Sequence, residues 1–79
     1  MSLGKMLAES AGKYAERVAV VHGDRKMTYR ELERAACALA NHLRSLGLGR
    51  GDKVAMMLPN CPEFVIAYFG IQKIGGVAV

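Results

Sequence analysis

Two short segments carry residues whose types and spacing could do chemistry. The first is the glycine-rich run Gly47-Leu-Gly-Arg-Gly51, because spaced glycines let backbone amides come close to a phosphate. Phosphate loops lead from a strand into a helix, whose amino terminus adds its dipole, whereas this run lies between a predicted helix and a predicted strand. That order favours a helix stop followed by a turn over a phosphate site.

The second segment, Pro59-Asn-Cys-Pro-Glu63, does lie between a predicted strand and a predicted helix. Asn60, Cys61 and Glu63 could therefore face a ligand. A cysteine nucleophile needs a neighbouring base, and no histidine stands near Cys61 in the sequence. We expect a helix start instead, with Asn60 as the cap, Pro62 at an early helical position and an acidic first turn.

The other side chains able to do chemistry are scattered. Cys37 and Cys61 lack CxxC spacing, and His22 and His42 stand alone, so a metal site is not expected. The tyrosines can be substrate contacts or core rings, and a core position is the simpler reading of the one inside an apolar helix; they are Tyr14, Tyr29 and Tyr68. No catalytic, cofactor-binding or metal-ligating role is therefore assigned to any numbered residue.

Composition excludes several classes of protein. Hydrophobic residues make up 52% of the 79 residues, enough for a collapsed core, although a chain this short and apolar tends to associate or to have lost neighbours. The net charge of +4 is spread along the chain rather than gathered in a stripe, which argues against nucleic-acid binding. No apolar run reaches the roughly 18 residues of a membrane span. A reducing, cytoplasmic setting is expected.

In the first half of the chain, residue periodicity predicts a short amphipathic helix over residues 3–15. A β-hairpin follows, with a β-branched strand over residues 18–21, Gly23 and Asp24 at its tip and a second strand at residues 26–28.

Thr28-Tyr-Arg-Glu31 is a capping-box pattern, so a second helix is expected to begin there and to end at Gly47. Its polar positions are expected to face away from the core, and they include Glu33. Its apolar stripe consists of Leu32, Ala35, Ala36, Leu39, Leu43 and Leu46.

The second half reads as strand, helix and strand. The run Val54-Ala-Met-Met-Leu58 has no polar alternation, which predicts a parallel strand covered on both faces. A helix over residues 62–74 is apolar almost all the way round, more than a chain this short can cover. Gly75-Gly76 ends it, and a strand begins at Val77. We therefore expect an α/β fold: part of a doubly wound, mostly parallel sheet with flanking helices, plus a small β-hairpin.

Four blocks in order, covering most of the chain from about residue 7, resemble the amino-terminal segment of adenylate-forming enzymes, and most of all the fatty-acyl-CoA ligases. They are Val20-Val-His-Gly-Asp-Arg-Lys-Met-Thr-Tyr-Arg-Glu-Leu32, Ala40-Asn-His-Leu-Arg-Ser-Leu-Gly47, Gly51-Asp-Lys-Val-Ala55 and Leu58-Pro-Asn-Cys-Pro-Glu-Phe64.

The resemblance implies a parent enzyme that uses ATP, Mg²⁺ and CoA. A carboxylate attacks the α-phosphate of ATP, and CoA then displaces AMP from the acyl-adenylate. In that family the phosphate loop, the ribose-binding acid and the carboxy-terminal lysine lie downstream of the matched segment. Residues 1–79 are thus expected to be an amino-terminal fragment of the large amino-terminal domain, without the catalytic core or carboxy-terminal domain. The fragment is expected to bind no cofactor and to be inactive alone.

The expected partner is the rest of the parent enzyme. The alternative is a small self-associating interaction module without catalysis, forming a homodimer or a swapped oligomer through the apolar helix at residues 62–74. A small nucleotide-binding protein is a third reading. Which carboxylic acid the parent takes is left open.

Overall fold

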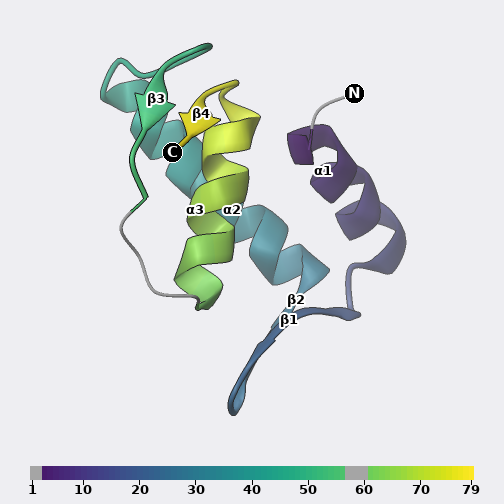
Figure 1. The fold of residues 1–79 in the computed structure, drawn as a ribbon. Coiled ribbons are helices and arrows are strands. Elements are labelled where there is room, and N and C mark those ends of the chain that lie inside the picture. The colour runs from purple at the N-terminus through teal and green to yellow at the C-terminus, as the bar shows by residue number, and fades with distance from the viewer. Residues whose placement is uncertain (1–2, 57–60) are drawn as a thin grey trace.

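The computed structural model describes residues 3–56 and 61–79. Within these ranges the chain forms three helices and two separate two-stranded sheets (Figure 1). In chain order the elements are α1 (Leu3–Tyr14), β1 (Val18–His22), β2 (Arg25–Thr28), α2 (Tyr29–Ser45), β3 (Lys53–Val54), α3 (Pro62–Lys73) and β4 (Val77–Ala78).

The predicted hairpin is confirmed. Strands β1 and β2 pair antiparallel, with His22 opposite Arg25. The turn between them uses Gly23 at a φ of 61°, a left-handed conformation that glycine adopts without steric cost. The hairpin projects from the end of the helical body (Figure 1).

The capping box that begins α2 is also confirmed. The Thr28 hydroxyl accepts the Glu31 N–H at 3.2 Å, and the Glu31 carboxylate accepts the Thr28 N–H at 2.9 Å. Gly47, at a φ of 88°, stops the helix as expected. The predicted place of Leu46 in the buried stripe is wrong, because it caps the helix and is 64% exposed. Ala40 lies in the core instead.

Small side chains let the three helices approach closely. Ala36 and Ala40 of α2 are buried, and a Cβ placed on Gly70 of α3 would lie 2.9 Å from the Leu39 methyl group Cδ2. Helices packed at such distances need glycine or alanine at the contact. The buried core that results contains Leu7, Leu32, Ala36, Ala40, Ile71 and Ile74.

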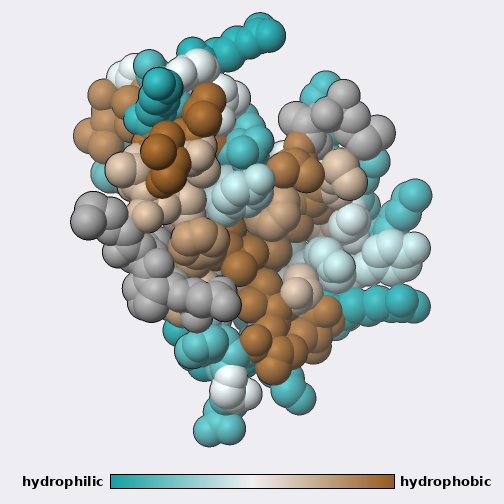
Figure 2. Space-filling model, in the orientation of Figure 1, coloured by the Kyte–Doolittle hydropathy of each residue, from teal (hydrophilic) through white to brown (hydrophobic). Residues whose placement is uncertain are grey.

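One parallel strand pair is present, as the apolar run predicted. Lys53 lies opposite Val77 and Val54 opposite Ala78. The strand is shorter than predicted in the described residues, since β3 ends at Val54 and Ala55 is exposed; residues 57 and 58 lie outside the described ranges. The prediction that the strand is covered on both faces is wrong for its described part. Helix α3 packs on one face of the strand pair, while hydrophobic residues on the other face are exposed (Figures 1 and 2).

The doubly wound sheet is not seen among the described residues. The hairpin strands form a sheet of their own, so β3, α3 and β4 make one strand–helix–strand unit. The fold is a three-helix body with two small sheets.

Helix α3 begins with Pro62 at its first position, as predicted. The cap position belongs to Cys61, whose side chain makes no capping hydrogen bond, so the prediction of Asn60 as the cap was wrong by one residue. Asn60 itself lies outside the described residues. Every residue of α3 except Glu63 is buried or half-buried, so the body covers this apolar helix to a large extent but not completely.

Candidate functional site

The glycine-rich loop does not form a phosphate cradle. The Gly49 N–H donates to the Asp52 carboxylate at 2.7 Å. The loop amide is therefore bonded to a negatively charged side chain of the same loop. The Gly51 N–H donates to the Gly75 carbonyl at 2.9 Å. The loop also follows the carboxyl end of α2, where the helix dipole repels an anion. Its amides are used internally, which confirms the helix stop and turn and argues against phosphate.

The junction before α3 carries one well-defined ion pair. The two terminal guanidinium nitrogens of Arg25 donate to the carboxylate oxygens of Glu63, at 3.1 and 2.7 Å. This bidentate contact ties β2 of the hairpin to the first turn of α3. Glu63, a candidate ligand contact in the sequence, is thus held by the hairpin.

The pairing changes the acidity of Glu63. The hydrogen bond from Arg25 lowers the pKa of this carboxyl from 4.5 to about 2, although burial acts in the opposite direction. A carboxyl held ionised in this way is a poor general acid near neutral pH. The contact therefore anchors the helix start rather than preparing it for proton transfer.

A second ion pair joins the helices. The Lys73 ammonium lies 2.6 Å from the Glu33 carboxylate, with the two side chains only 12% and 22% exposed. The same ammonium donates to the Gly4 carbonyl of α1 at 3.3 Å. Lys73 of α3 thus connects α2 and α1. The prediction that Glu33 faces away from the core was wrong; its position three residues before Ala36 and seven before Ala40, on the small-residue face, was the signal available.

Two hollows flank α2. A hollow of about 360 Å³ opens between the three helices, and three cations line it: Lys5, Arg44 and Lys73. Arg44 and Lys73 contact protein oxygens. The second, of about 290 Å³, is lined only by apolar side chains of α2, α3 and the β3 segment. Among the described residues, the first hollow is lined by Cys37 but by no histidine or carboxylate that could serve as its base. The lining residues of the second hollow are Leu39, Leu43, Val54, Ala55, Met56, Ala67 and Ile71.

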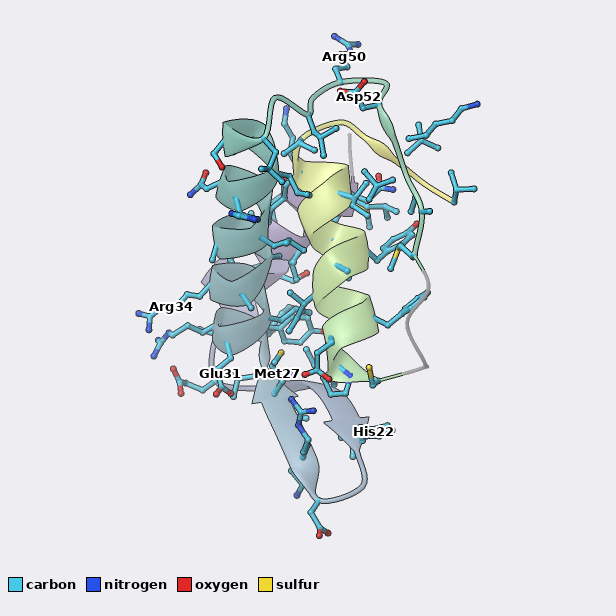
Figure 3. All side chains as sticks on the ribbon, turned by 90° about the vertical axis from the view of Figure 1, so that its left-hand side faces the viewer. His22, Met27, Glu31, Arg34, Arg50 and Asp52 are labelled. Atoms are coloured by element: carbon cyan, nitrogen blue, oxygen red, sulfur yellow. The ribbon has the colours of Figure 1, made fainter. Side chains whose placement is uncertain are left out.

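The other residues singled out in the sequence stay apart. Figure 3 places His22 on the hairpin at one end of the molecule and Arg50 with Asp52 at the opposite end. His42 is exposed on α2, while Cys37 and Cys61 are half-buried on different helix segments.

The three tyrosines are accounted for without a ligand. Tyr68 is half-buried and meets the Phe69 ring edge-on at 5.7 Å, Tyr29 packs against the core, and Tyr14 lies 4.9 Å beneath the Arg17 guanidinium.

The side chains in residues 3–56 and 61–79 do not fit ATP or Mg²⁺. The glycine loop has no free cradle of amides, and no group of three His, Cys, Asp or Glu side chains in these ranges could hold a metal ion. Nor is any helix there long and apolar enough to cross a membrane. No reaction step can be derived from the described residues.

Comparison with known proteins gives the family. The model of the AMP-binding enzyme family matches residues 7–79. The long-chain-fatty-acid–CoA ligase of Bacillus subtilis is 38% identical over 99% of this chain. The 3-hydroxybenzoate/4-hydroxybenzoate–CoA ligase of Thauera aromatica is 42% identical over 98% of it. The chain spans only 14% of the length of either ligase.

A solved structure agrees with this result. The amino-terminal subdomain of Klebsiella oxytoca NpsA superimposes with a TM-score of 0.93 at 35% identity, covering 98% of this chain and 20% of that one. The three helices and small sheets described above therefore match part of an adenylation-enzyme subdomain. On the family match over residues 7–79, the chain belongs to the AMP-binding enzymes.

Proposed function

We propose that this chain is the amino-terminal scaffold segment of an ATP-dependent acid–thiol ligase. Such an enzyme converts a carboxylic acid, ATP and CoA into acyl-CoA, AMP and pyrophosphate. The observation that carries the proposal is the family match over residues 7–79 together with the small share, 14%, of each ligase that the chain spans.

The contacts of the chain support a scaffold role. Its two best-defined ion pairs join elements to one another: Arg25 with Glu63 joins the hairpin to α3, and Lys73 with Glu33 joins α3 to α2. The charged side chains of these two pairs thus help to hold the helices in place. ATP, Mg²⁺ and CoA are proposed to bind to other parts of the enzyme, which we place in the cytoplasm.

We further propose a fatty acid as the acid substrate, by the likeness to the Bacillus subtilis ligase. The likeness to a hydroxybenzoate–CoA ligase at a similar identity makes an aromatic acid the competing choice. The choice between a fatty and an aromatic acid rests on the relatives alone.

Two measurements on the 79-residue chain test the proposal. Incubation with Mg²⁺-ATP, a long-chain fatty acid and labelled pyrophosphate is expected to give no label in ATP. Calorimetric titration with Mg²⁺-ATP is expected to give no binding heat. Exchange that scales with chain concentration, or saturable heat, would show a nucleotide site in this chain and overturn the scaffold role.

Self-association through the helix at residues 62–74 stays a prediction. All of that helix except Glu63 is buried or half-buried within one chain, which leaves little apolar area for a partner. Sedimentation at several concentrations distinguishes a scaffold segment from a self-associating module. A monomer, or a mixture of species without fixed stoichiometry, fits a scaffold segment. A defined dimer abolished by changes in α3 would favour the interaction module.

A further inference from the structure

The hollow between the three helices has a lining rich in hydrogen-bond donors. Its volume, about 360 Å³, is at the lower end of the range for small-molecule sites. Among the described residues that line it, three are cationic, one is an amide, one is a thiol and none is a carboxylate. These polar residues are Lys5, Cys37, Asn41, Arg44 and Lys73.

The oxygen acceptors beside these cations are already in use. Oδ1 of Asn41 accepts a hydrogen bond from the Arg44 guanidinium at 3.1 Å, and the Lys73 carbonyl accepts a second one at 3.3 Å. The Gly4 carbonyl accepts from the Lys73 ammonium at 3.3 Å. A guanidinium has five N–H donors and a side-chain amide has two, so Arg44 and Asn41 keep donors for a ligand. A ligand that offers acceptors fits this hollow best.

The charges favour the same kind of ligand. Lys73 is offset by the Glu33 carboxylate 2.6 Å away, but Arg44 contacts two neutral oxygens, which do not offset its charge. Lys5 adds a cation from α1. The carboxyl ends of α2 and α3 act against an anion, yet each carries only about half an elementary charge. The cations outweigh them, so the hollow attracts anions.

We propose that this hollow binds a phosphate group, held by the Arg44 guanidinium with Lys5 and the Asn41 amide as further donors. A planar guanidinium can make two parallel hydrogen bonds to phosphate oxygens. No described residue of the lining is aromatic, so a nucleoside base has no ring to stack on. The ligand is inorganic phosphate or a phosphate monoester. Mg²⁺-ATP fits poorly, because the metal already neutralises its phosphates. The inference does not depend on the proposed function.

The two cysteines provide a readout. Cys37 lines the hollow, whereas Cys61 lies at the start of α3 outside it. Alkylation of both by N-ethylmaleimide is followed by peptide mass spectrometry at increasing sodium phosphate, with the ionic strength held constant by sodium chloride. The measurement is made on the 79-residue chain and on a chimera in which these residues replace the matching segment of the Bacillus subtilis long-chain-fatty-acid–CoA ligase.

Phosphate is expected to slow the alkylation of Cys37 about tenfold when it is in about tenfold excess over its Kd, because only the unliganded hollow reacts. The rate at Cys61 should not change. Arg44→Gln should abolish the protection, and Lys5→Gln, which changes an exposed side chain, should weaken it. Arg34→Gln is the matched control, because it removes an equal charge from α2 outside the hollow and should keep the protection.

A parallel titration with AMP distinguishes the two sources of the phosphate group. Protection by phosphate and by AMP at similar concentrations would assign the hollow to phosphate groups in general, and protection by phosphate alone would assign it to the free ion. Protection by AMP at a far lower concentration would reveal a base-binding part and overturn the assignment.

Three other results would also overturn the inference. One is an alkylation rate of Cys37 that phosphate does not change. The second is equal slowing of Cys61, or protection that survives both Arg44→Gln and Lys5→Gln, which would show general stabilisation by excluded phosphate. The third is protection in the 79-residue chain but not in the chimera, which would show that the rest of the ligase covers the hollow.

Discussion

Arg25 and Glu63 lie far apart in the sequence, yet their side chains meet in a two-pronged ion pair between the hairpin and α3. Glu63 stood in the most chemically suggestive segment of the sequence. Its carboxylate is occupied by a guanidinium, so a candidate ligand contact became a structural one. At the scale of single residues, this pair of charges joins two elements of the fold.

The pairing makes a prediction about acidity. Arg25→Gln should raise the pKa of Glu63 from about 2 toward 4.5, because the hydrogen bond from Arg25 is the main cause of its lowering. A carboxyl with a lowered pKa stabilises the fold above pH 4.5, and that contribution is lost as the pH falls through about 2. Titration of the Glu63 side-chain carboxyl carbon by NMR measures the pKa, and urea unfolding at several pH values measures the contribution to stability.

Arg34→Gln is the matched control, because it removes an exposed positive charge of α2 that no described contact links to Glu63. Arg34→Gln should leave the pKa of Glu63 at about 2. If Arg25→Gln also leaves the pKa of Glu63 unchanged, the ion pair between Arg25 and Glu63 does not persist in solution.

The pair between Lys73 and Glu33 makes a second prediction. Lys73→Met leaves the Glu33 carboxylate between helices without its counter-charge and should cost about 1–3 kcal/mol of unfolding free energy. The double variant Lys73→Met with Glu33→Leu should cost less than the single one, because no unpaired charge remains. Urea unfolding of both variants gives the comparison, and a double variant less stable than Lys73→Met would refute it.

At the scale of elements, local signals predicted what local interactions determine. The capping box at Thr28 and the left-handed Gly23 and Gly47 set the start of α2 and two turns through contacts within a few residues, so the sequence alone was sufficient. Two predictions were wrong: the cap of α3 at Asn60 and the burial of Leu46. Helix ends depend on how neighbouring segments pack, and pattern alone places them only to within a residue or two.

Longer-range features could not be predicted. The pairing of Glu33 with Lys73 spans two helices, and periodicity on one helix cannot reveal its partner on another. The same holds for the candidate site: the sequence suggested that the glycine loop is a turn, but only the fold shows the Asp52 carboxylate inside it.

Close packing of α2 against α3 gives a prediction for this scale. Gly70→Ala places a methyl group 2.9 Å from Leu39 Cδ2 and should destabilise the chain by up to about 2 kcal/mol, overpacking exceeding the gain in helix propensity. Gly12→Ala in α1 meets open space and should stabilise by about 1 kcal/mol or less. Thermal or urea unfolding compares the two, and stabilisation by Gly70→Ala would mean that α2 and α3 are not tightly packed there.

At the scale of the whole molecule, the helices cover one another while Val77 and Val79 at the small parallel sheet stay exposed. The apolar run before Pro59 and the apolar helix after it predicted a parallel sheet, and the parallel pairing of β3 with β4 confirms that part. The wider doubly wound sheet stays a prediction, because the described strands form two separate two-stranded sheets.

The most direct test of the scaffold role is fatty-acid-dependent exchange of labelled pyrophosphate into ATP by the Bacillus subtilis ligase chimera that carries these 79 residues. The proposed role predicts exchange by the chimera and none by the same ligase lacking its matching segment or by the 79-residue chain alone. A chimera that folds but exchanges no more label than the ligase lacking the segment would contradict it.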